Sequence, residues 1–195
     1  MTKRDFERIL AFHGGPAMAG IKAGNLISCA KDKYPDFFRW IRQYQYDFKD
    51  KGIRFEVLYT GDKNHLLFTY RERVLKEALE QGEVQALLER LGYPVCSGVD
   101  EILSYLKMRF HAHKDFPHEI GVFLGYPLAD ILGYVKYHGR GCKLSGYWKV
   151  YGDVEEAKKR FLQFEKCRNA ITKKVQAGWA LSQIFPSERM AARAC

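Results

Sequence analysis

The sequence contains no hydrophobic run long enough to cross a membrane. A spanning helix needs roughly 18 or more consecutive apolar residues, and no segment of this chain approaches that length. Its first residues do not resemble a secretory signal either, because charged side chains (Lys3, Arg4, Asp5 and Glu7) stand where such a signal has its apolar region. We therefore expect a cytoplasmic protein.

Metal-binding and disulfide patterns are also missing. The five cysteines are widely spaced, odd in number and never separated by only two residues, which argues against a disulfide framework and against a zinc-finger site. The zinc motif H-E-x-x-H does not occur. His111, His113 and His118 lack the spacing of a ligand set, so we expect no metal centre.

Known nucleotide- and nucleic-acid-binding motifs are absent as well. Neither the Walker A pattern nor G-x-G-x-x-G occurs, and no zinc finger or RNP1 motif is found. There is no internal repeat, low-complexity segment or linker. These absences exclude the commonest ATP-binding, dinucleotide-binding and RNA-binding classes, but they do not exclude binding by an unfamiliar site.

What is present is a globular composition with an uneven charge. The chain has 195 residues, of which 47% are hydrophobic and 14% aromatic, and this suits one domain with a full core. We expect that domain over residues 1–185 and a mobile tail over 186–195. The net charge is +9, and residues 136–195 contain 13 Lys/Arg against 5 Asp/Glu. Such a basic segment attracts nucleic acid, anionic lipid or acidic small molecules.

Hydrophobic periodicity predicts helices alternating with short strands. The expected helices cover residues 5–12, 25–34, 36–51, 71–81, 83–91, 99–111, 127–135 and 153–177. The expected strands cover residues 54–59, 66–70, 118–124 and 147–151, the first two forming a hairpin. The order strand, helix, strand over residues 118–151 predicts a parallel crossover. The fold class is therefore α+β, with a small mixed sheet of about four strands (one hairpin plus a βαβ unit) surrounded by helices.

The first candidate site is a glycine-rich segment over residues 13–25. Glycines let a backbone approach a ligand closely, and Lys22 with loop N–H groups would suit a phosphate or carboxylate. His13, Gly15 and Asn25 belong to the same segment. The alternative is a turn-rich connection in which Asn25 only caps a helix.

The second candidate lies at the end of the predicted strand 118–124. Gly125 and Tyr126 would stand at its carboxyl end, where open sheets with parallel strands place ligands. His118 would lie at the other end, and on a strand its neighbour Glu119 points to the opposite face, so adjacency does not make them a catalytic pair. An exposed His118 without catalytic function is the alternative to a general base.

The third candidate is the segment from Lys143 to Lys149. Strand alternation places Tyr147 and Lys149 on one face and Trp148 on the other. A lysine beside aromatic rings suits a flat anionic ligand or stacked single-stranded bases. The alternative is that Trp148 belongs to the core and Lys149 is only solvated.

These motifs together resemble one known family. The order His13-x-x-Pro-x-x-Ala-Gly-x-Lys22-x-x-Asn25, His118-Glu-Ile-Gly-x-Phe-Leu-Gly-Tyr-Pro127-x-x-Asp130 and Gly146-Tyr-Trp-Lys-Val-Tyr151 is similar to the DUF3793 family. That family consists of uncharacterised proteins found mainly in anaerobic Firmicutes. The resemblance implies a place in iron or redox metabolism, because the family's genes lie near flavodoxin and iron-uptake genes. The chain departs from the family at Gly14, where relatives have cysteine, and this weakens a thiol role for the first motif.

The leading functional hypothesis is a protein that binds a small anionic metabolite or cofactor, either as an enzyme or as a simple binder. His13 and His118 are the candidate catalytic residues. The candidate ligand-binding residues are His13, Gly15, Lys22, Asn25, Gly125, Tyr126, Lys143, Tyr147, Trp148 and Lys149. One version makes the ligand haem or another redox cofactor, with a histidine as axial ligand. The alternatives are a nucleic-acid-binding protein that uses the basic C-terminal third, and a non-catalytic interaction protein.

Overall fold

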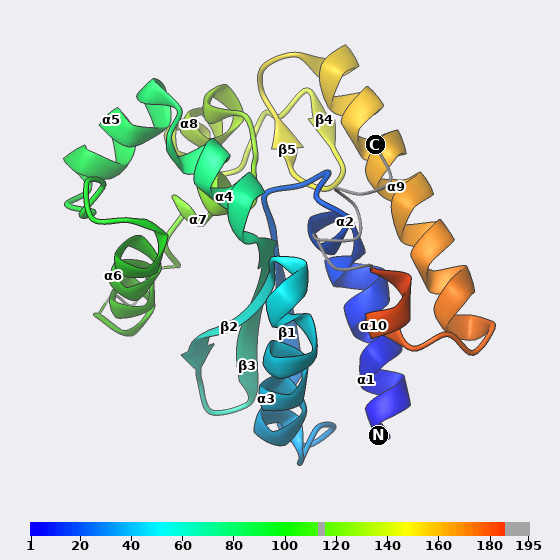
Figure 1. The fold of residues 1–195 in the computed structure, drawn as a ribbon. Helices are drawn as coiled ribbons and strands as arrows, with labels where there is room; N and C mark the ends of the chain where they lie inside the picture. Colours follow the sequence, from blue (N-terminus) through cyan, green and yellow to red (C-terminus); the bar gives the residue numbers. More distant parts are fainter. Residues whose placement is uncertain (113–115, 186–195) are drawn as a thin grey trace. The chain divides into compact units, whose positions relative to one another are not determined.

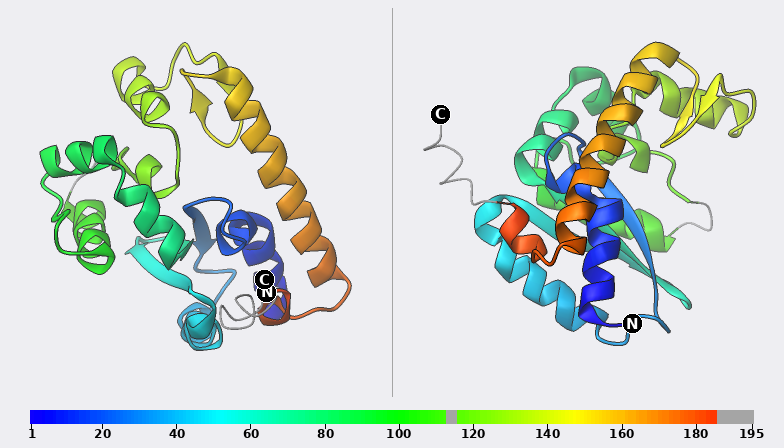
Figure 2. Two further views of the ribbon diagram at one scale, coloured as in Figure 1. Left: turned by 45° about the horizontal axis from the view of Figure 1, so that its top comes forward. Right: turned by 90° about the vertical axis from the view of Figure 1, so that its right-hand side faces the viewer.

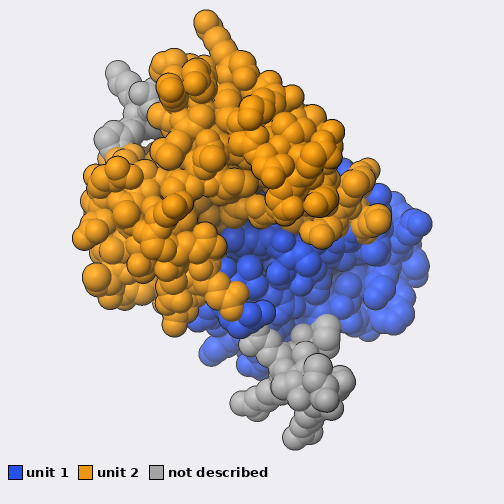
Figure 3. All heavy atoms as spheres, turned by 90° about the horizontal axis from the view of Figure 1, so that it is seen from above, with its two compact units in different colours: residues 1–74, 167–195 blue, residues 75–166 orange. Residues whose placement is uncertain are grey.

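A computed structural model describes residues 1–112 and 116–185 of the chain and confirms the α+β class (Figure 1). Contacts divide the chain into two compact units, which Figure 3 shows in different colours: residues 1–74 with 167–195, and residues 75–166. We call them unit 1 and unit 2 and describe each by itself. One domain over residues 1–185 stays a prediction. The tail predicted to be mobile, residues 186–195, lies outside the described residues.

Unit 1 is built on a three-stranded antiparallel sheet. Its strand order is β1-β3-β2, and β3 pairs on one side with β1, from Gly24 opposite Tyr70 to Ala30 opposite Asn64. The hairpin of β2 and β3 confirms the predicted one, although a register shift interrupts β2 between Val57 and Tyr59. The strands are β1 (Gly24–Ala30), β2 (Ile53–Thr60) and β3 (Asn64–Arg71).

The helices of unit 1 follow the apolar periodicity of the sequence. Thr2 and Asp5 form a reciprocal capping box at the start of the first helix. Helix α3 begins one residue after the predicted start and keeps its predicted buried stripe. The helical elements are α1 (Lys3–Ile9), the π-helix η1 (Leu10–Gly14), α2 (Gly15–Met18), α3 (Phe37–Phe48), the 3-10 turn η2 (Lys49–Lys51) and α10 (Leu181–Ile184).

An aromatic core holds α1 and α3 against the sheet. The ring of Phe6 lies 5.9 Å from Phe37 and 5.4 Å from Trp40, and Tyr44 lies 5.7 Å from Phe55 of β2. Figures 1 and 2 show both helices on one face of the sheet. Pairs of aromatic rings at these separations add stability beyond the area they bury, so these contacts stabilise this face of unit 1.

The predicted loop at residues 14–24 and the helix after Asn25 are wrong. The helical conformation does not end at the Gly-Gly-Pro sequence. The π-helix η1 leads directly into α2, whose first turn accommodates Pro16. Asn25 lies in β1, opposite Thr69, and caps no helix. Its neighbours explain the difference, because Ile27 and Cys29 alternate into the core as a strand requires.

Unit 2 is mainly helical. Its own elements are α5 (Gly82–Arg90), α6 (Val99–Ala112), α7 (Ile120–Phe123), α8 (Leu128–Tyr137), β4 (Leu144–Ser145) and β5 (Lys149–Val150). Two further helices, α4 (Glu72–Leu79) and α9 (Val154–Gln176), begin in one unit and end in the other. Within the described ranges, no helix combines the length and apolarity needed to cross a membrane.

The predicted βαβ unit does not form. The segment read as a strand is the short helix α7, with the N–H of Leu124 bonded to the carbonyl of Ile120. The apolar residues of this segment are all buried: Ile120, Val122, Phe123 and Leu124. The alternation of Ile120, Val122 and Leu124 therefore did not mark one buried face of a strand. The second predicted strand pairs instead with β4 in an antiparallel hairpin, Leu144 opposite Val150. The described sheets are therefore both antiparallel, not mixed.

Candidate ligand pocket in unit 2

A pocket of about 520 Å³ lies in unit 2, among α7, α8 and the hairpin of β4 and β5. Ligand sites are usually concave, mainly apolar and furnished with a few polar groups, and the lining has that character. The lining residues are Phe116, His118, Ile120, Gly121, Leu124, Tyr126, Asp130, Ile131, Tyr134, Ser145, Gly146, Trp148 and Lys149. The pocket thus draws on two of the three motifs singled out in the sequence.

Trp148 and Tyr126 provide an aromatic wall of fixed orientation. Their rings are stacked with centroids 4.9 Å apart, and Phe161 of α9 meets the indole edge-on at 4.5 Å. The Arg160 guanidinium lies 5.3 Å from the indole ring and donates to the carbonyl of Gly125 at 2.8 Å. Burial raises the pKa of Tyr126 to about 12, so its hydroxyl stays protonated and donates to the carbonyl of Tyr147.

Asp130 on α8 fixes this wall from behind. Its Oδ2 accepts the indole N–H of Trp148 at 2.7 Å, and its Oδ1 accepts the backbone N–H groups of Tyr151 and Gly152, each at 2.7 Å. Only 2% of the residue is exposed. A buried carboxylate is tolerated because hydrogen bonds replace its water. Asp130 therefore joins α8 to the residues on both sides of β5, Trp148 before it and Tyr151 and Gly152 after it.

One cationic side chain, Lys149, lines the pocket. Lys149 is exposed, donates to the carbonyl of Gly139 at 2.6 Å and lies 5.9 Å from the ring of Tyr134. An ammonium group has three donors, so this bond leaves two for a ligand. Residues 131–152 contain four cations and no carboxylate: Lys136, Arg140, Lys143 and Lys149. Of these four cations, Lys149 is the one that lines the pocket.

His118 stands at the side of the pocket. Its ring meets Tyr134 edge-on with centroids 5.1 Å apart, and the residue is exposed. It also lines a second hollow of about 380 Å³, formed with residues of α5 and α8 such as Leu87 and Leu132. Its position would let it exchange a proton with a bound molecule and with solvent.

The neighbouring Glu119 points away from solvent and has a structural role. It is 6% exposed, and its Oε1 accepts hydrogen bonds from Arg109 Nε at 2.8 Å and Tyr93 Oη at 3.0 Å. Burial of Arg109 acts to lower its pKa, but the hydrogen bond and charge of Glu119 leave that pKa raised. Burial and the charge of Glu119 raise the pKa of Tyr93. This network fixes the turn that carries His118.

The pocket brings together four predicted site residues: His118, Tyr126, Trp148 and Lys149. Three others lie close in sequence but outside its lining. Gly125 has a φ of +70° and offers its carbonyl to Arg160. Tyr147 packs against Phe161 and Phe164 in a small core. Lys143 donates to the carbonyl of Gly152 at 3.0 Å.

The four residues of the first motif belong to unit 1. Lys22 is 3% exposed, so solvent hardly reaches it. A Cβ atom on Gly15 would lie 3.1 Å from Ile171, which shows that this glycine permits close helix packing. Asn25 faces Thr69 across the strand pair, and Asn25 Oδ1 and Thr69 Oγ1 have no hydrogen-bond partner among the described residues. None of the four lines the unit 2 pocket.

His13 ends the π-helix beside an aromatic and cationic pair. Its ring lies 4.9 Å from that of Phe12, and the Arg168 guanidinium lies 4.4 Å from Phe12. Partial burial and the positive charge of Arg168 lower the pKa of His13. The imidazole is therefore mainly neutral at pH 7, and the site prediction for His13 stays a prediction.

The sequence analysis missed Tyr134 and Phe116, two aromatic residues of the lining. Tyr134 follows Asp130 by four positions and lies on the same side of α8, a helical spacing that could have identified it. Phe116 has no such signal, because it follows a helix and belongs to no periodic pattern.

The described residues contain no group of three or more His, Cys, Asp or Glu side chains arranged to hold a metal ion. The four cysteines among the described residues are free, and Cys167 packs against the core of unit 1, where burial raises its pKa.

Fold and pocket define an α+β protein with an aromatic-lined pocket in unit 2 and one lysine, Lys149, in its lining. The sequence model of DUF3793, described as "Protein of unknown function (DUF3793)", matches residues 10–185. The chain belongs to this family, as its motifs predicted. No curated protein and no solved structure matches it.

Proposed function

We propose that this protein binds a small anionic molecule with a flat aromatic part in the unit 2 pocket. The observation that supports the proposal is the lining itself, in which Tyr126, Tyr134 and Trp148 surround a space of about 520 Å³ and Lys149 stands at its rim. Aromatic rings bind flat molecules by stacking, and the lysine would pair with a carboxylate or phosphate.

The charge of the segment that carries Lys149 supports an anion over a cation. The segment from residue 131 to 152 carries four positive charges and no carboxylate. Asp130 is the acidic residue of the lining, but its two oxygens already accept three hydrogen bonds. It therefore offers little to a cationic ligand.

An enzymatic role would rest on His118. Acid–base catalysis needs a group that can exchange a proton with the ligand, and His118 is exposed at the pocket side. Redox cofactors such as flavin mononucleotide and haem are flat aromatic anions and fit the same chemistry. For haem, His118 would hold the iron and Lys149 one carboxylate. A place in iron or redox metabolism of a cytoplasmic protein follows as part of this proposal.

The experiment is a binding screen with a matched pair of lysine variants. Flavin mononucleotide, haem, aromatic carboxylates and aromatic phosphates are titrated into the protein by calorimetry, and absorption spectra of the protein purified without oxygen reveal a retained chromophore. Lys149→Met is compared with Lys143→Met, because each lysine donates to a backbone carbonyl but only Lys149 lines the pocket.

We expect Lys149→Met to weaken binding of the ligand about tenfold or more, as loss of a hydrogen bond to a charged group does. Lys143→Met should bind as the wild type does. Equal losses in both variants would show a diffuse charge effect, and binding unaffected by Lys149→Met would contradict the proposal.

A further inference from the structure

The net positive charge of the chain belongs to unit 1. Residues 1–74 and 167–195 contain 19 Lys/Arg against 10 Asp/Glu, whereas residues 75–166 contain 13 of each. The basic surface is therefore not confined to the C-terminal third, where the linear sequence placed it. A positively charged unit attracts polyanions independently of any pocket in unit 2.

Helix α3 displays aromatic and basic side chains together on its outward face. Tyr46 is 80% exposed and Phe38 is 51% exposed, although their neighbours Phe37, Trp40 and Tyr44 are buried in the core. The outward face contains no aliphatic side chain; the exposed residues of α3 and the adjoining η2 are Phe38, Arg39, Arg42, Gln43, Gln45, Tyr46, Lys49 and Asp50. A face of this composition offers no apolar groove for a partner helix.

The two arginines of this face have no polar partner within residues 1–112 and 116–185. Neither Arg39 nor Arg42 makes an ion pair or side-chain hydrogen bond with any residue that the structure describes. By contrast, Arg54 of the same unit pairs with Glu72 at 2.7 Å. Arginine binds phosphate by two parallel hydrogen bonds and also stacks on flat rings, so Arg39 and Arg42 are available for both interactions.

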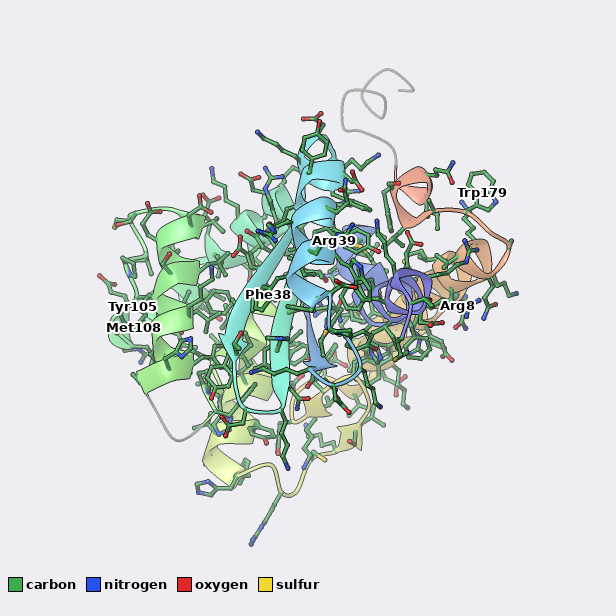
Figure 4. All side chains as sticks on the ribbon, turned by 90° about the horizontal axis from the view of Figure 1, so that it is seen from below. Arg8, Phe38, Arg39, Tyr105, Met108 and Trp179 are labelled. Carbon is green, nitrogen blue, oxygen red and sulfur yellow. The ribbon has the colours of Figure 1, made fainter. Side chains whose placement is uncertain are left out.

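Spacing along α3 suits a linear ligand. Phe38 and Tyr46 are eight residues apart, about 12 Å along a helix, and Arg39 and Arg42 lie between them in sequence. Figure 4 shows Phe38 and Arg39 near the start of α3; Arg8 and Trp179 are visible in the same view. Trp179 is also 52% exposed, with the Lys174 ammonium 5.9 Å from its ring. Exposed rings beside cations thus recur in unit 1.

We propose that the α3 face, defined as Phe38, Arg39, Arg42, Tyr46 and Lys49, binds single-stranded nucleic acid. The arginines and the lysine would contact phosphates, and the two aromatic rings would stack on unpaired bases, which is how proteins bind single strands without reading their sequence. A duplex keeps its bases stacked and would leave the rings unused. An acidic peptide would use the cations but not the flat rings.

The test measures binding of fluorescein-labelled oligo-dT and oligo-U to the full chain by anisotropy at several salt concentrations. Three variants separate the contributions: Arg39→Gln/Arg42→Gln removes charge, Tyr46→Ala removes a ring, and Tyr46→Phe keeps it. Lys159→Gln/Lys166→Gln is the charge-matched control, because both lysines are exposed on α9 in the basic C-terminal third. All these side chains are exposed, so thermal unfolding should be unchanged.

We expect Tyr46→Ala to weaken binding about tenfold, in the range measured for one stacked base, and Tyr46→Phe to bind as the wild type does. The arginine double variant should lower the slope of log affinity against log salt by about 1.4, since each phosphate contact on a single strand contributes about 0.7. The α9 control should keep most of the affinity, and adding Tyr46→Ala to it should weaken binding as much as in the wild type.

Three results would overturn the proposal. One is equal affinity for duplex and single strand with no effect of Tyr46→Ala. Another is a loss in the α9 control as large as in the arginine double variant. The third is competition by poly-glutamate as strong as by unlabelled oligo-dT at equal charge, which would identify an acidic peptide as the occupant. None of these results bears on ligand binding in unit 2.

Discussion

The carboxylate of Asp130 holds the indole ring of Trp148 in place, with 2.7 Å between Oδ2 and Nε1. The two residues are buried, and their hydrogen bond joins helix α8 to the residue just before strand β5. Since Trp148 forms a wall of the pocket and Asp130 also fixes the turn after β5 through two backbone N–H groups, this contact determines the shape of the pocket.

Replacing Asp130 by Asn should destabilise unit 2. The amide keeps one acceptor oxygen but turns an N–H donor toward either the indole N–H or the two backbone N–H groups, leaving a buried polar group without an acceptor. We expect a loss of about 2 kcal/mol in the free energy of unfolding and a red shift of Trp148 fluorescence, both measured in urea titrations. Asp62→Asn, at an exposed residue of the β2–β3 loop, is the control and should have no effect.

Replacing Arg109 by Met should destabilise the protein. It removes the charged partner of Glu119, which is 6% exposed, and breaking a buried ion pair in this way costs about 3 kcal/mol. Arg90→Met, which removes a bond to the carbonyl of Ala86 on an exposed surface, should cost little. Denaturant titrations of both variants measure the difference, and equally small losses would contradict a stabilising role for the Arg109–Glu119 pair.

The stability of unit 1 should fall in mild acid through His65. The ring stacks on Phe37 with centroids 4.4 Å apart, and Nδ1 bonds to Thr60 Oγ1 at 3.0 Å. Burial, together with the charge of Lys31, lowers the pKa of His65 below its ordinary value of 6.5. The unfolded chain therefore binds this proton more readily than the folded protein does.

The stabilising contribution of the neutral ring is consequently complete above pH 6.5 and is lost as the pH falls toward the lowered pKa of the folded state. Thermal unfolding from pH 8 to pH 5 should show this loss, and His65→Gln should reduce the slope. An unchanged slope in that variant would assign the effect to other groups, among them His13, whose pKa is lowered as well.

Two glycines of unit 2 should respond oppositely to alanine. A Cβ atom on Gly133 would lie 2.5 Å from the Tyr151 ring, so Gly133→Ala must displace the end of the hairpin strand. We expect a loss of about 1–3 kcal/mol, as in other overpacked sites. A Cβ atom on Gly82 meets nothing within 4 Å at the start of α5, so Gly82→Ala should be neutral or slightly stabilising. Denaturant titrations of both variants check the contrast.

Local sequence patterns predicted the elements that bury one regular face. The helix with Phe37, Trp40 and Tyr44 in one stripe and the β2–β3 hairpin formed as expected. The strand prediction for residues 118–124 was wrong because the apolar part of this segment is buried on all sides. A short apolar run of this kind fits a strand or a helix equally well.

The loop prediction for the first motif was wrong for another reason. Gly14 and Gly15 suggested a loop, but they instead allow close packing, with a Cβ on Gly14 only 3.0 Å from Thr69 Oγ1. That partner is more than fifty residues away in sequence, so no local pattern could reveal it. The pocket, by contrast, was partly predictable because Tyr126, Trp148 and Lys149 lie in motifs dense in aromatic and basic residues.

The most direct test of the ligand pocket uses the indole N–H signals of the three tryptophans, recorded by NMR on ¹⁵N-labelled protein during titration with the tightest ligand of the screen. Trp148 lines the pocket, whereas Trp40 is buried in the unit 1 core and Trp179 is exposed after α9. We predict that the Trp148 signal shifts with the ligand and that the Trp40 and Trp179 signals stay in place. A saturable shift of Trp40 or Trp179 with an unmoved Trp148 would contradict the proposed site.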